Sequence, residues 1–153
     1  MITFLGWLFS ALLILIVLPV LVLFVQVLLA CLPARSRSST QGSRPRVAVL
    51  VPAHNESSII VATLSSIQAQ LGEGDRLLVV ADNCSDDTAE VSRTAGAEVV
   101  ERSDDQRRGK GYALDFGVRH LANAAPDVMI IIDADCQVGE GAIERLAKRC
   151  MES

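Results

Sequence analysis

The sequence predicts an α/β protein, a Rossmann-like and doubly wound sheet of mostly parallel strands, preceded by one transmembrane helix. Three observations support this prediction. The opening 33 residues are almost wholly apolar, whereas the rest of the 153-residue chain mixes charged and hydrophobic residues. In that second part, short continuous runs of β-branched residues alternate with amphipathic stretches of helical spacing. Continuous apolar runs are typical of parallel strands that helices cover on both faces.

Residues 1–33 form the predicted transmembrane anchor. From Ile2 to Leu32 the chain contains no Lys, Arg, Asp or Glu, and roughly 20 apolar residues suffice for a helix to cross a bilayer. A signal peptide would carry basic residues before a shorter apolar core, and no basic residue precedes this run. Pro19 is compatible with a helix embedded in lipid. We therefore expect an uncleaved, single-pass anchor in the cell membrane.

Residues 34–45 form the predicted juxtamembrane linker, which is polar and rich in Ser and Arg. The positive charges that follow the anchor have no acidic residue among them, and they are Arg35, Arg37, Arg44 and Arg46. Such an excess of positive charge is typical of the cytoplasmic flank of a membrane helix. The soluble domain is therefore expected on the cytoplasmic side.

Composition argues against two other classes of protein. The four cysteines, Cys31, Cys84, Cys136 and Cys150, form no Cys-x-x-Cys pair, so neither a zinc cluster nor a disulfide framework is predicted. The net charge is −4, and the arginines are not grouped with aromatic residues as in nucleic-acid-binding surfaces. We therefore expect reduced thiols and no nucleic-acid partner.

Residues 46–153 form the predicted α/β domain. Its strands are expected at 47–51, 76–80, 97–100 and 128–132. Its helices are expected at 56–71, 85–96, 111–121 and 141–151. Gly72 and Gly96 end the first two helices, and Ser85 is the expected N-cap of the second. Alternation of strand and helix implies right-handed crossovers in a doubly wound sheet.

Polar clusters follow three of these strands. The segments are Pro-Ala-His-Asn-Glu after the first strand, Ala-Asp-Asn-Cys-Ser-Asp-Asp after the second and Asp-Ala-Asp-Cys after the fourth. Ligands of doubly wound sheets bind at the carboxyl ends of the strands. The three clusters are therefore expected to line one crevice.

Asp133 and Asp135 are the predicted metal ligands. Two carboxylates one residue apart at a strand end supply the hard oxygen atoms that Mg²⁺ or Mn²⁺ prefers. Such ions commonly complete their coordination with water and substrate phosphates, so a phosphate-bearing ligand is expected. A dinucleotide site is disfavoured because no Gly-x-Gly-x-x-Gly follows the first strand. A P-loop is excluded because Lys110 is followed by Gly111 in place of Ser or Thr.

Four motifs resemble the nucleotide-binding half of family 2 glycosyltransferases, which have the GT-A fold. They are VAVLVPAHNES, VVADNCSDDTAEVSRTAGAEVV, RRGKGYALDFG and VMIIIDADCQV. Each motif alone is loose, but their order and spacing are specific to that family. The resemblance covers nearly all of the chain after the linker.

The resemblance implies roles for individual residues. Pro52, Ala53 and Glu56 would line the nucleoside pocket, and Asp82 would accept hydrogen bonds from the base. The remaining three would contact the phosphates and the metal: Lys110 the diphosphate, Asp133 the ribose and metal, and Asp135 the metal directly. Structural alternatives stay open, with Pro52 as a turn former, Lys110 as a solvated loop charge and Glu56 as a residue that favours a helix N-terminus.

Five further residues in or near the motifs are expected to have no chemical role. Asp86 and Asp87 are assigned mainly to helix capping. His54 is expected at the rim of the pocket, without a visible partner, and His120 on a helix surface. Cys136 is expected to be a small buried filler.

The implied function is metal-dependent, inverting transfer of a sugar from a nucleotide-sugar donor, with a UDP-sugar favoured, to a lipid or polysaccharide acceptor at the cytoplasmic membrane face. In the family the general base lies further along than the Asp-x-Asp motif, so it is expected beyond Ser153. The domain would be incomplete, and the chain alone would bind donor weakly and transfer no sugar. The alternative is a non-catalytic, membrane-tethered nucleotide-sugar-binding module. A sugar-phosphate nucleotidyltransferase is disfavoured because no Gly-rich, Arg-containing loop follows the first strand.

Overall fold

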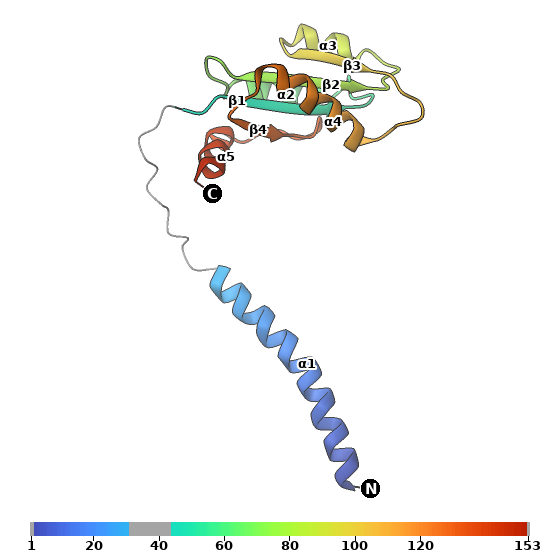
Figure 1. Ribbon diagram of the computed structural model, residues 1–153, viewed down its shortest axis with the longest axis vertical. Coiled ribbons are helices and arrows are strands. Elements are labelled where there is room, and N and C mark those ends of the chain that lie inside the picture. Colours follow the sequence, from blue (N-terminus) through green and yellow to red (C-terminus); the bar gives the residue numbers. More distant parts are fainter. Residues whose placement is uncertain (1, 31–43, 153) are drawn as a thin grey trace. The chain divides into compact units, whose positions relative to one another are not determined.

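The computed structural model describes residues 2–30 and 44–152, which belong to two separate compact units. The first unit is a single helix and the second is an α/β domain (Figure 1). Most of the predicted linker, with Arg35 and Arg37, lies outside the described residues.

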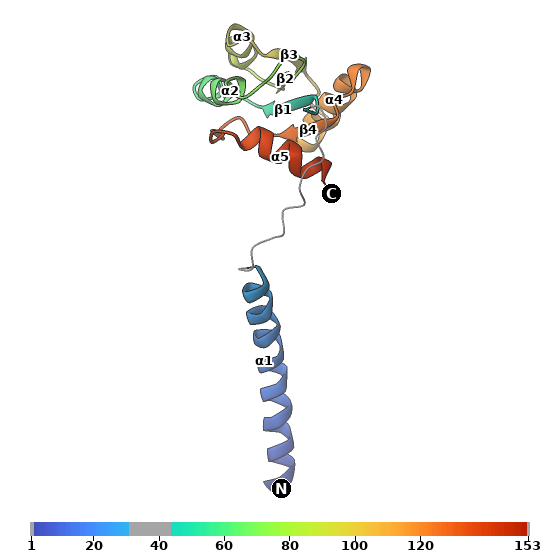
Figure 2. The same ribbon diagram turned by 90° about the vertical axis from the view of Figure 1, so that its left-hand side faces the viewer.

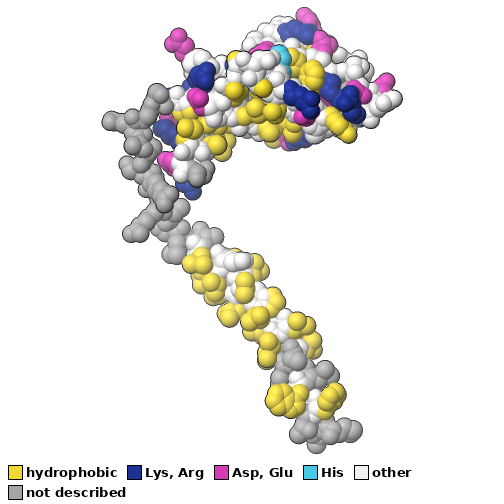
Figure 3. All heavy atoms as spheres, in the orientation of Figure 1, with side chains coloured by type: hydrophobic (Ala, Val, Ile, Leu, Met, Phe, Trp, Pro, Cys, Tyr) yellow, Lys and Arg dark blue, Asp and Glu magenta, His cyan; other side chains and the backbone are white. Residues whose placement is uncertain are grey.

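Helix α1 (Ile2–Ala30) is the predicted anchor. Its described side chains are all exposed, and hydrophobic side chains dominate its visible face (Figure 3). The segment Leu12–Leu29 is long and apolar enough to cross a membrane, and no other helix among the described residues meets that condition. Pro19 lies inside the helix. By length and composition, α1 is thus a candidate membrane span.

Four parallel strands form the sheet of the α/β domain, in the order β3-β2-β1-β4. Their bounds are β1 (Val47–Ala53), β2 (Arg76–Asp82), β3 (Glu98–Arg102) and β4 (Val128–Ile131). Val49 pairs with Leu77 of β2 on one side and with Ile130 of β4 on the other. The chain thus moves outward from β1 in one direction to β3 and then crosses back to β4, which makes the sheet doubly wound.

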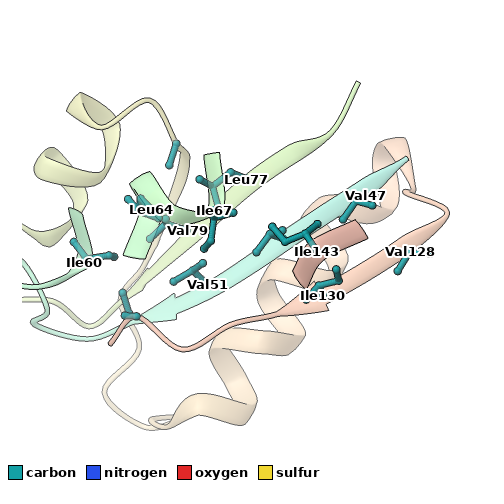
Figure 4. Packing of buried hydrophobic residues seen from close by; sticks show 14 of the residues in the cluster. Val47, Val51, Ile60, Leu64, Ile67, Leu77, Val79, Val128, Ile130 and Ile143 are labelled. Atoms are coloured by element: carbon teal, nitrogen blue, oxygen red, sulfur yellow. The ribbon is translucent and has the colours of Figure 1, made fainter. Parts of the chain in front are cut away.

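The helices cover both faces of this sheet. They are α2 (Ile60–Gln68), α3 (Thr88–Thr94), α4 (Lys110–Leu121) and α5 (Ala142–Met151), with a short 3₁₀ turn η1 (Ala122–Ala124) after α4. One face packs Val49 and its strand neighbours against α2 and α5 (Figure 4). The other face packs Leu50 and Val80 against α4 (Figure 2). The predicted class, an α/β fold with a doubly wound parallel sheet, is confirmed.

Gly117 explains how closely α4 approaches the sheet. A Cβ atom at this position would lie 2.5 Å from Cδ1 of Leu50 and 2.9 Å from Cγ2 of Val80. Only a residue without a side chain fits this contact without displacing buried atoms. The close packing fixes α4, and with it the position of Lys110 at the first turn of the helix.

The starts of two helices differ from the sequence prediction. Residues 57–59 form a turn, and α2 begins at Ile60. The amide of Glu56 donates to Oγ1 of Thr88 at 2.8 Å and so ties this turn to the start of α3. Ser85 is not the N-cap of α3, which begins at Thr88. Its amide instead donates to Oδ1 of Asn55 at 2.7 Å. In both places, contacts between the loops after β1 and β2 override the local helix signals.

The amino end of the sheet is closed by ion pairs. Arg44 contacts the buried carboxylate of Asp75 at 2.7 Å, and that carboxylate also accepts the amide of Val47 at 2.8 Å. The amide of Arg46 donates to Asp127 at 2.8 Å. Two of the four arginines expected to flank the membrane therefore bind acids of the domain.

Candidate functional site

A pocket of about 380 Å³ lies at the carboxyl end of the sheet, beside the first turn of α4. All seven residues assigned to the site from the sequence line it, and they are Pro52, Ala53, Glu56, Asp82, Lys110, Asp133 and Asp135. Pro52 and Ala53 are the last residues of β1, and Asp82 is the last residue of β2, so these three belong to the strands themselves. The structure thus brings the polar clusters of β1, β2 and β4 into one crevice.

Six further residues line the same pocket. Sequence reasoning had not assigned Asn83, Arg108, Gly109, Ala113 and Ala134 to it, and it had placed His54 at the rim. Arg108 and Gly109 stand directly before Lys110 in the motif RRGKGYAL. That position was the one available signal for them, and it could have extended the predicted site by two residues.

The two acidic residues after β4 stand on a turn that the domain holds firmly. Oγ1 of the buried Thr63 donates to the carbonyl of Ala134 at 2.7 Å, and the amide of Cys136 donates to the carbonyl of Asp133 at 3.0 Å. Ala134 is buried between two more exposed aspartates. The turn therefore presents both carboxylates to the pocket.

The partners of these two carboxylates differ. Asp133 forms an ion pair with Lys110, and both side chains are about half exposed. Among the described residues, Asp135 has one hydrogen-bond partner, the thiol of Cys136, at 3.6 Å. Hard oxygen atoms with access to water suit Mg²⁺ or Mn²⁺, which commonly take only one or two protein carboxylates. The donor set fits such an ion, although the described residues contain no group of three metal-ligating side chains.

Cys136 differs from the sequence prediction. It is exposed, whereas a buried filler was expected. Its hydrogen bond to Asp135, together with the negative charges of Asp135 and Asp133, raises the pKa of the thiol above its ordinary value. The thiol therefore stays protonated near neutral pH and is a poor nucleophile.

Asp82 is held at the pocket by an ion pair with a residue that the sequence analysis missed. Its side chain is 9 % exposed, and its Oδ1 lies 2.6 Å from Nη1 of Arg102 at the end of β3. Nδ2 of Asn83 donates to the same oxygen at 3.0 Å. No local motif marks Arg102, because the pair forms only when β2 and β3 lie side by side.

Contacts between the loops after β1 and β2 fix the floor of the pocket. His54 donates from Nδ1 to the carbonyl of Asp82 at 2.7 Å, so it has a partner that the sequence did not show. Asn55 and Asn83 adopt left-handed backbone conformations, with φ of 56° and 52°. Asparagine tolerates this region better than most residues. The two asparagines therefore support a tight exit from each strand.

Asp86 also has a clear structural role. Its Oδ1 accepts hydrogen bonds from the amide and the hydroxyl of Thr88, at 3.0 Å and 2.5 Å. The hydrogen bonds from Thr88 lower its pKa to about 2. Asp87 occupies the N-cap position but makes no capping hydrogen bond through its side chain. Of the two residues, Asp86 therefore supplies the hydrogen bonds to the first turn of α3.

The segment between β3 and α4 is attached to the same site. The amide of Asp104 donates to Oδ1 of Asn83 at 2.7 Å, and its carboxylate accepts the amide of Arg107 at 3.0 Å. The bond from the Arg107 amide is the main cause that holds the pKa of Asp104 below its ordinary value. Gly109, with φ of 116°, then turns the chain into α4. This path carries Lys110 to the pocket.

Fold and pocket together define a doubly wound α/β protein with a pocket lined by charged residues at the carboxyl ends of its strands, where ligands of such sheets bind. The family model described as glycosyl transferase family 2 matches residues 48–152, which is most of the chain. The chain belongs to glycosyl transferase family 2.

Known relatives agree with this family. An uncharacterized glycosyltransferase of Mycobacterium tuberculosis is 39% identical over 100 residues, which are 65% of this chain and 41% of the relative. A mannosyltransferase from Pyrobaculum calidifontis, solved with GDP-mannose and Mn²⁺, superposes with a TM-score of 0.62 at 26% identity, over 74% of this chain and 34% of that one. Glucosyl-3-phosphoglycerate synthase from M. tuberculosis, solved with UDP, gives 0.50 at 31% identity over 60% and 34%.

The relatives are much longer than the part they share with this chain. The chain spans about two fifths of the length of the M. tuberculosis glycosyltransferase and about a third of each of the two solved enzymes. The family match at residues 48–152 includes every residue that lines the pocket. These residues therefore correspond to only a part of each whole enzyme.

Proposed function

We propose that this chain is the donor-binding half of a metal-dependent, inverting glycosyltransferase. It would bind a nucleotide sugar, with a UDP-sugar favoured, for transfer to a lipid or polysaccharide acceptor at the cytoplasmic membrane face. The observation that supports this most is the composition of the pocket: one nearly buried carboxylate, one lysine and two exposed carboxylates converge at the carboxyl ends of three strands. These are groups suited to a base, a diphosphate and a divalent cation, respectively.

The diphosphate end of the pocket would be formed by Lys110, Asp133 and Asp135. Asp135 would bind the metal directly and Asp133 would contribute to the metal and the ribose. The bound ion would neutralise the negative charge that develops on the departing nucleoside diphosphate. Lys110 can leave its exposed ion pair with Asp133 at little cost and turn to the phosphates, because such pairs contribute about 0–1 kcal/mol.

The nucleoside end would be formed by the exits of β1 and β2. Pro52, Ala53 and Glu56 would line the nucleoside, and Asp82 would accept a hydrogen bond from the base. Two solved relatives were determined in complexes, one with UDP and one with GDP-mannose and Mn²⁺, and these complexes support a nucleotide as the ligand of the proposed site. Because one complex contains uracil and the other guanine, they do not decide which base this pocket binds.

The membrane part of the proposal depends on α1 and on the charges that follow it. Arg44 and Arg46 bind domain acids, so the topological signal would come mainly from Arg35 and Arg37. A cytoplasmic domain would have access to the nucleotide sugars of the cytoplasm. A reporter fused after Ser153 that is active only outside the membrane would contradict this orientation.

No residue of the pocket is assigned a role in activating the acceptor of the sugar. The general base is expected beyond position 153, in the part of the relatives' length that this chain does not span. A non-catalytic nucleotide-sugar-binding module is the alternative. Because the donor-binding half by itself is expected to transfer no sugar, the reading frame downstream of codon 153 separates the two proposals. A continuing frame that encodes an acidic motif would favour the enzyme, and a stop codon with no complementary partner gene would favour the module.

Calorimetry of UDP binding with and without Mn²⁺ tests the donor site. We expect Mn²⁺ to tighten UDP binding and Asp135→Asn to abolish that effect, because the substituted amide is a weaker metal ligand. Asp115→Asn is the matched control, since Asp115 is an exposed acid that pairs with Arg119 on α4 away from the pocket. The metal assignment would be contradicted if Mn²⁺ did not change the affinity for UDP, or if Asp135→Asn bound UDP as tightly as the wild type in the presence of Mn²⁺.

A further inference from the structure

The contacts of the Asp82 carboxylate affect which nucleotide base the pocket can bind. We propose that Arg102 is a positioning residue that makes the pocket select a base with a single imide N–H, uracil or thymine, over guanine. This inference rests on the proposed function, because it takes Asp82 as the carboxylate that receives the base.

One oxygen of Asp82 is already saturated. Oδ1 accepts Nη1 of Arg102 at 2.6 Å and Nδ2 of Asn83 at 3.0 Å. The two oxygens of a carboxylate offer about four acceptor sites, roughly two on each. Oδ1 therefore has no further capacity for a hydrogen bond from a ligand.

The other oxygen remains open to the pocket. Among the described residues, Oδ2 of Asp82 receives no hydrogen bond. No side-chain oxygen or nitrogen in the described part of the chain is both fully buried and unpaired, so Oδ2 retains some accessible surface. Asp82 lines the pocket, and its side chain is 9 % exposed. The carboxylate thus presents a single acceptor atom to a ligand.

A single acceptor distinguishes the bases by their donors. The imide edge of uracil or thymine carries one N–H, which one carboxylate oxygen satisfies. Guanine carries an N–H and an NH₂ side by side, which match both oxygens of a free carboxylate. With Oδ1 occupied, guanine would leave one donor without a partner beside the nearly buried carboxylate, and a donor that loses water without gaining a partner is costly.

Arg102 is itself held so that it cannot easily release Oδ1. Its Nη2 donates to the carbonyl of Arg107 at 2.6 Å and lies 3.3 Å from Oδ2 of Asp104. Its guanidinium lies over the ring of Tyr112, 5.6 Å from the centroid, a favourable cation–π geometry. Because the side chain is only 10 % exposed, the arginine is fixed before any ligand binds.

A purely structural role for this ion pair is the competing explanation, and the chain contains a matched pair that separates the two. Arg76 and Glu98 join the same two strands at the opposite end of the sheet, 2.9 Å apart. Neither residue lines the pocket. Loss of the Arg76 pair should weaken the sheet without changing the choice of base.

The experiment measures dissociation constants of UDP, dTDP and GDP for the full chain in lipid nanodiscs with Mn²⁺. We expect the wild type to bind UDP and dTDP about tenfold more tightly than GDP, the value of one unpaired donor. Arg102→Gln should bring the ratio of GDP to UDP constants near one, Arg102→Lys should restore part of the preference, and Arg76→Gln should leave it unchanged.

A second variant keeps the test decisive if Arg102→Gln does not fold. Asn83→Gly suits the left-handed backbone at this position, where φ is 52°, and frees one acceptor site on Oδ1. It should reduce the preference for UDP severalfold. An unchanged ratio in this variant would overturn the proposal.

Three other results would also overturn it, and they separate it from the proposed function. Equal affinity of the wild type for UDP and GDP would refute the selectivity but leave the donor site intact. An equal loss of affinity for all three nucleotides in Arg102→Gln would assign the arginine a structural role only. If the wild type bound none of the three, the proposed function itself would fail.

Discussion

The two ends of the sheet carry acidic residues in opposite states. At the amino end the acids are fully engaged: Asp75 accepts hydrogen bonds from two backbone amides and pairs with Arg44. At the carboxyl end, Asp82 keeps one oxygen open and Asp135 has only a thiol as partner among the described residues. Carboxylates whose oxygen atoms are hydrogen-bonded within the domain stabilise the fold, whereas carboxylates with a free oxygen atom are available to a ligand.

Two acids at the amino end show this engagement in their pKa values. Burial by itself would raise the pKa of Asp75, but hydrogen bonds from the amides of Gly72 and Val47 and from Arg44 outweigh it and lower the pKa below 3.8. Burial also opposes the shift of Glu98, whose pKa is lowered by its bonds to His120 and Arg76. The amino end therefore stabilises the ionised form of its acids through contacts within the domain.

Removal of the best-satisfied acid should have the largest effect on the fold. Asp75→Ala deletes three hydrogen bonds to a fully buried carboxylate and leaves two amides and Arg44 without their partner. We expect the free energy of unfolding to fall by about 3 kcal/mol, with the dissociation constant for UDP unchanged. Urea unfolding followed by circular dichroism in detergent micelles measures this loss. A change in UDP affinity at equal folding would break the division between the two ends.

The stability difference between Asp75→Ala and the wild type should also depend on pH. Because the pKa of Asp75 is lower in the folded than in the unfolded chain, its contribution is fully present above the unfolded value of 3.8 and is lost as the pH falls through the folded pKa. The gap between the two proteins should therefore be constant from pH 7 to about 5 and shrink below 3.8. A gap that grows on acidification would contradict the assigned sign.

The smallest effect on stability is expected at the carboxyl end. Lys110→Met removes an ion pair whose side chains are 55% and 48% exposed, and such pairs are typically worth less than about 1 kcal/mol. We expect unfolding to change by about 0.5 kcal/mol or less, while UDP binding weakens about tenfold because the diphosphate loses a cation. Lys148→Met is the control, since Lys148 pairs with Glu144 on α5 at similar exposure. Equal UDP affinity in both variants would remove Lys110 from the proposed site.

Much of the fold was predictable because the signals are local. Each predicted strand lies within two residues of the observed one, since continuous runs such as Val47–Val51 can be buried only inside a sheet covered on both faces. Gly96 ends the α3 region with φ of 86° as expected of a C-terminal glycine. The predicted helix starts at 56 and 85 were wrong. The amides of both residues bind side chains of a distant segment, Thr88 and Asn55, and such tertiary contacts have no local signal.

The pocket was predictable to the same extent. The rule that parallel strands end at one edge was enough to predict that Asp82 and Asp133 lie together, and the family resemblance added Lys110. All three residues line one pocket. Arg102 and the partner of His54 could not be foreseen, because each contact joins residues 20 or more positions apart across neighbouring strands. The exposure of Cys136 depended on where the turn after β4 faces.

The sequence by itself determined the apolar helix, the doubly wound sheet, the family motifs and the edge at which the polar residues gather. All of these depend on hydrophobic periodicity or on short motifs, which each segment carries whatever its neighbours are. Only the tertiary structure decided which carboxylate oxygen atoms already have hydrogen-bond partners. Both oxygen atoms of Asp75 have partners. Asp82 has partners on Oδ1 but not on Oδ2, and Asp135 has only the thiol of Cys136 among the described residues. Hydrogen bonds between distant segments depend on the packed arrangement of strands, and that arrangement separates the acids of the fold from the acids of the site.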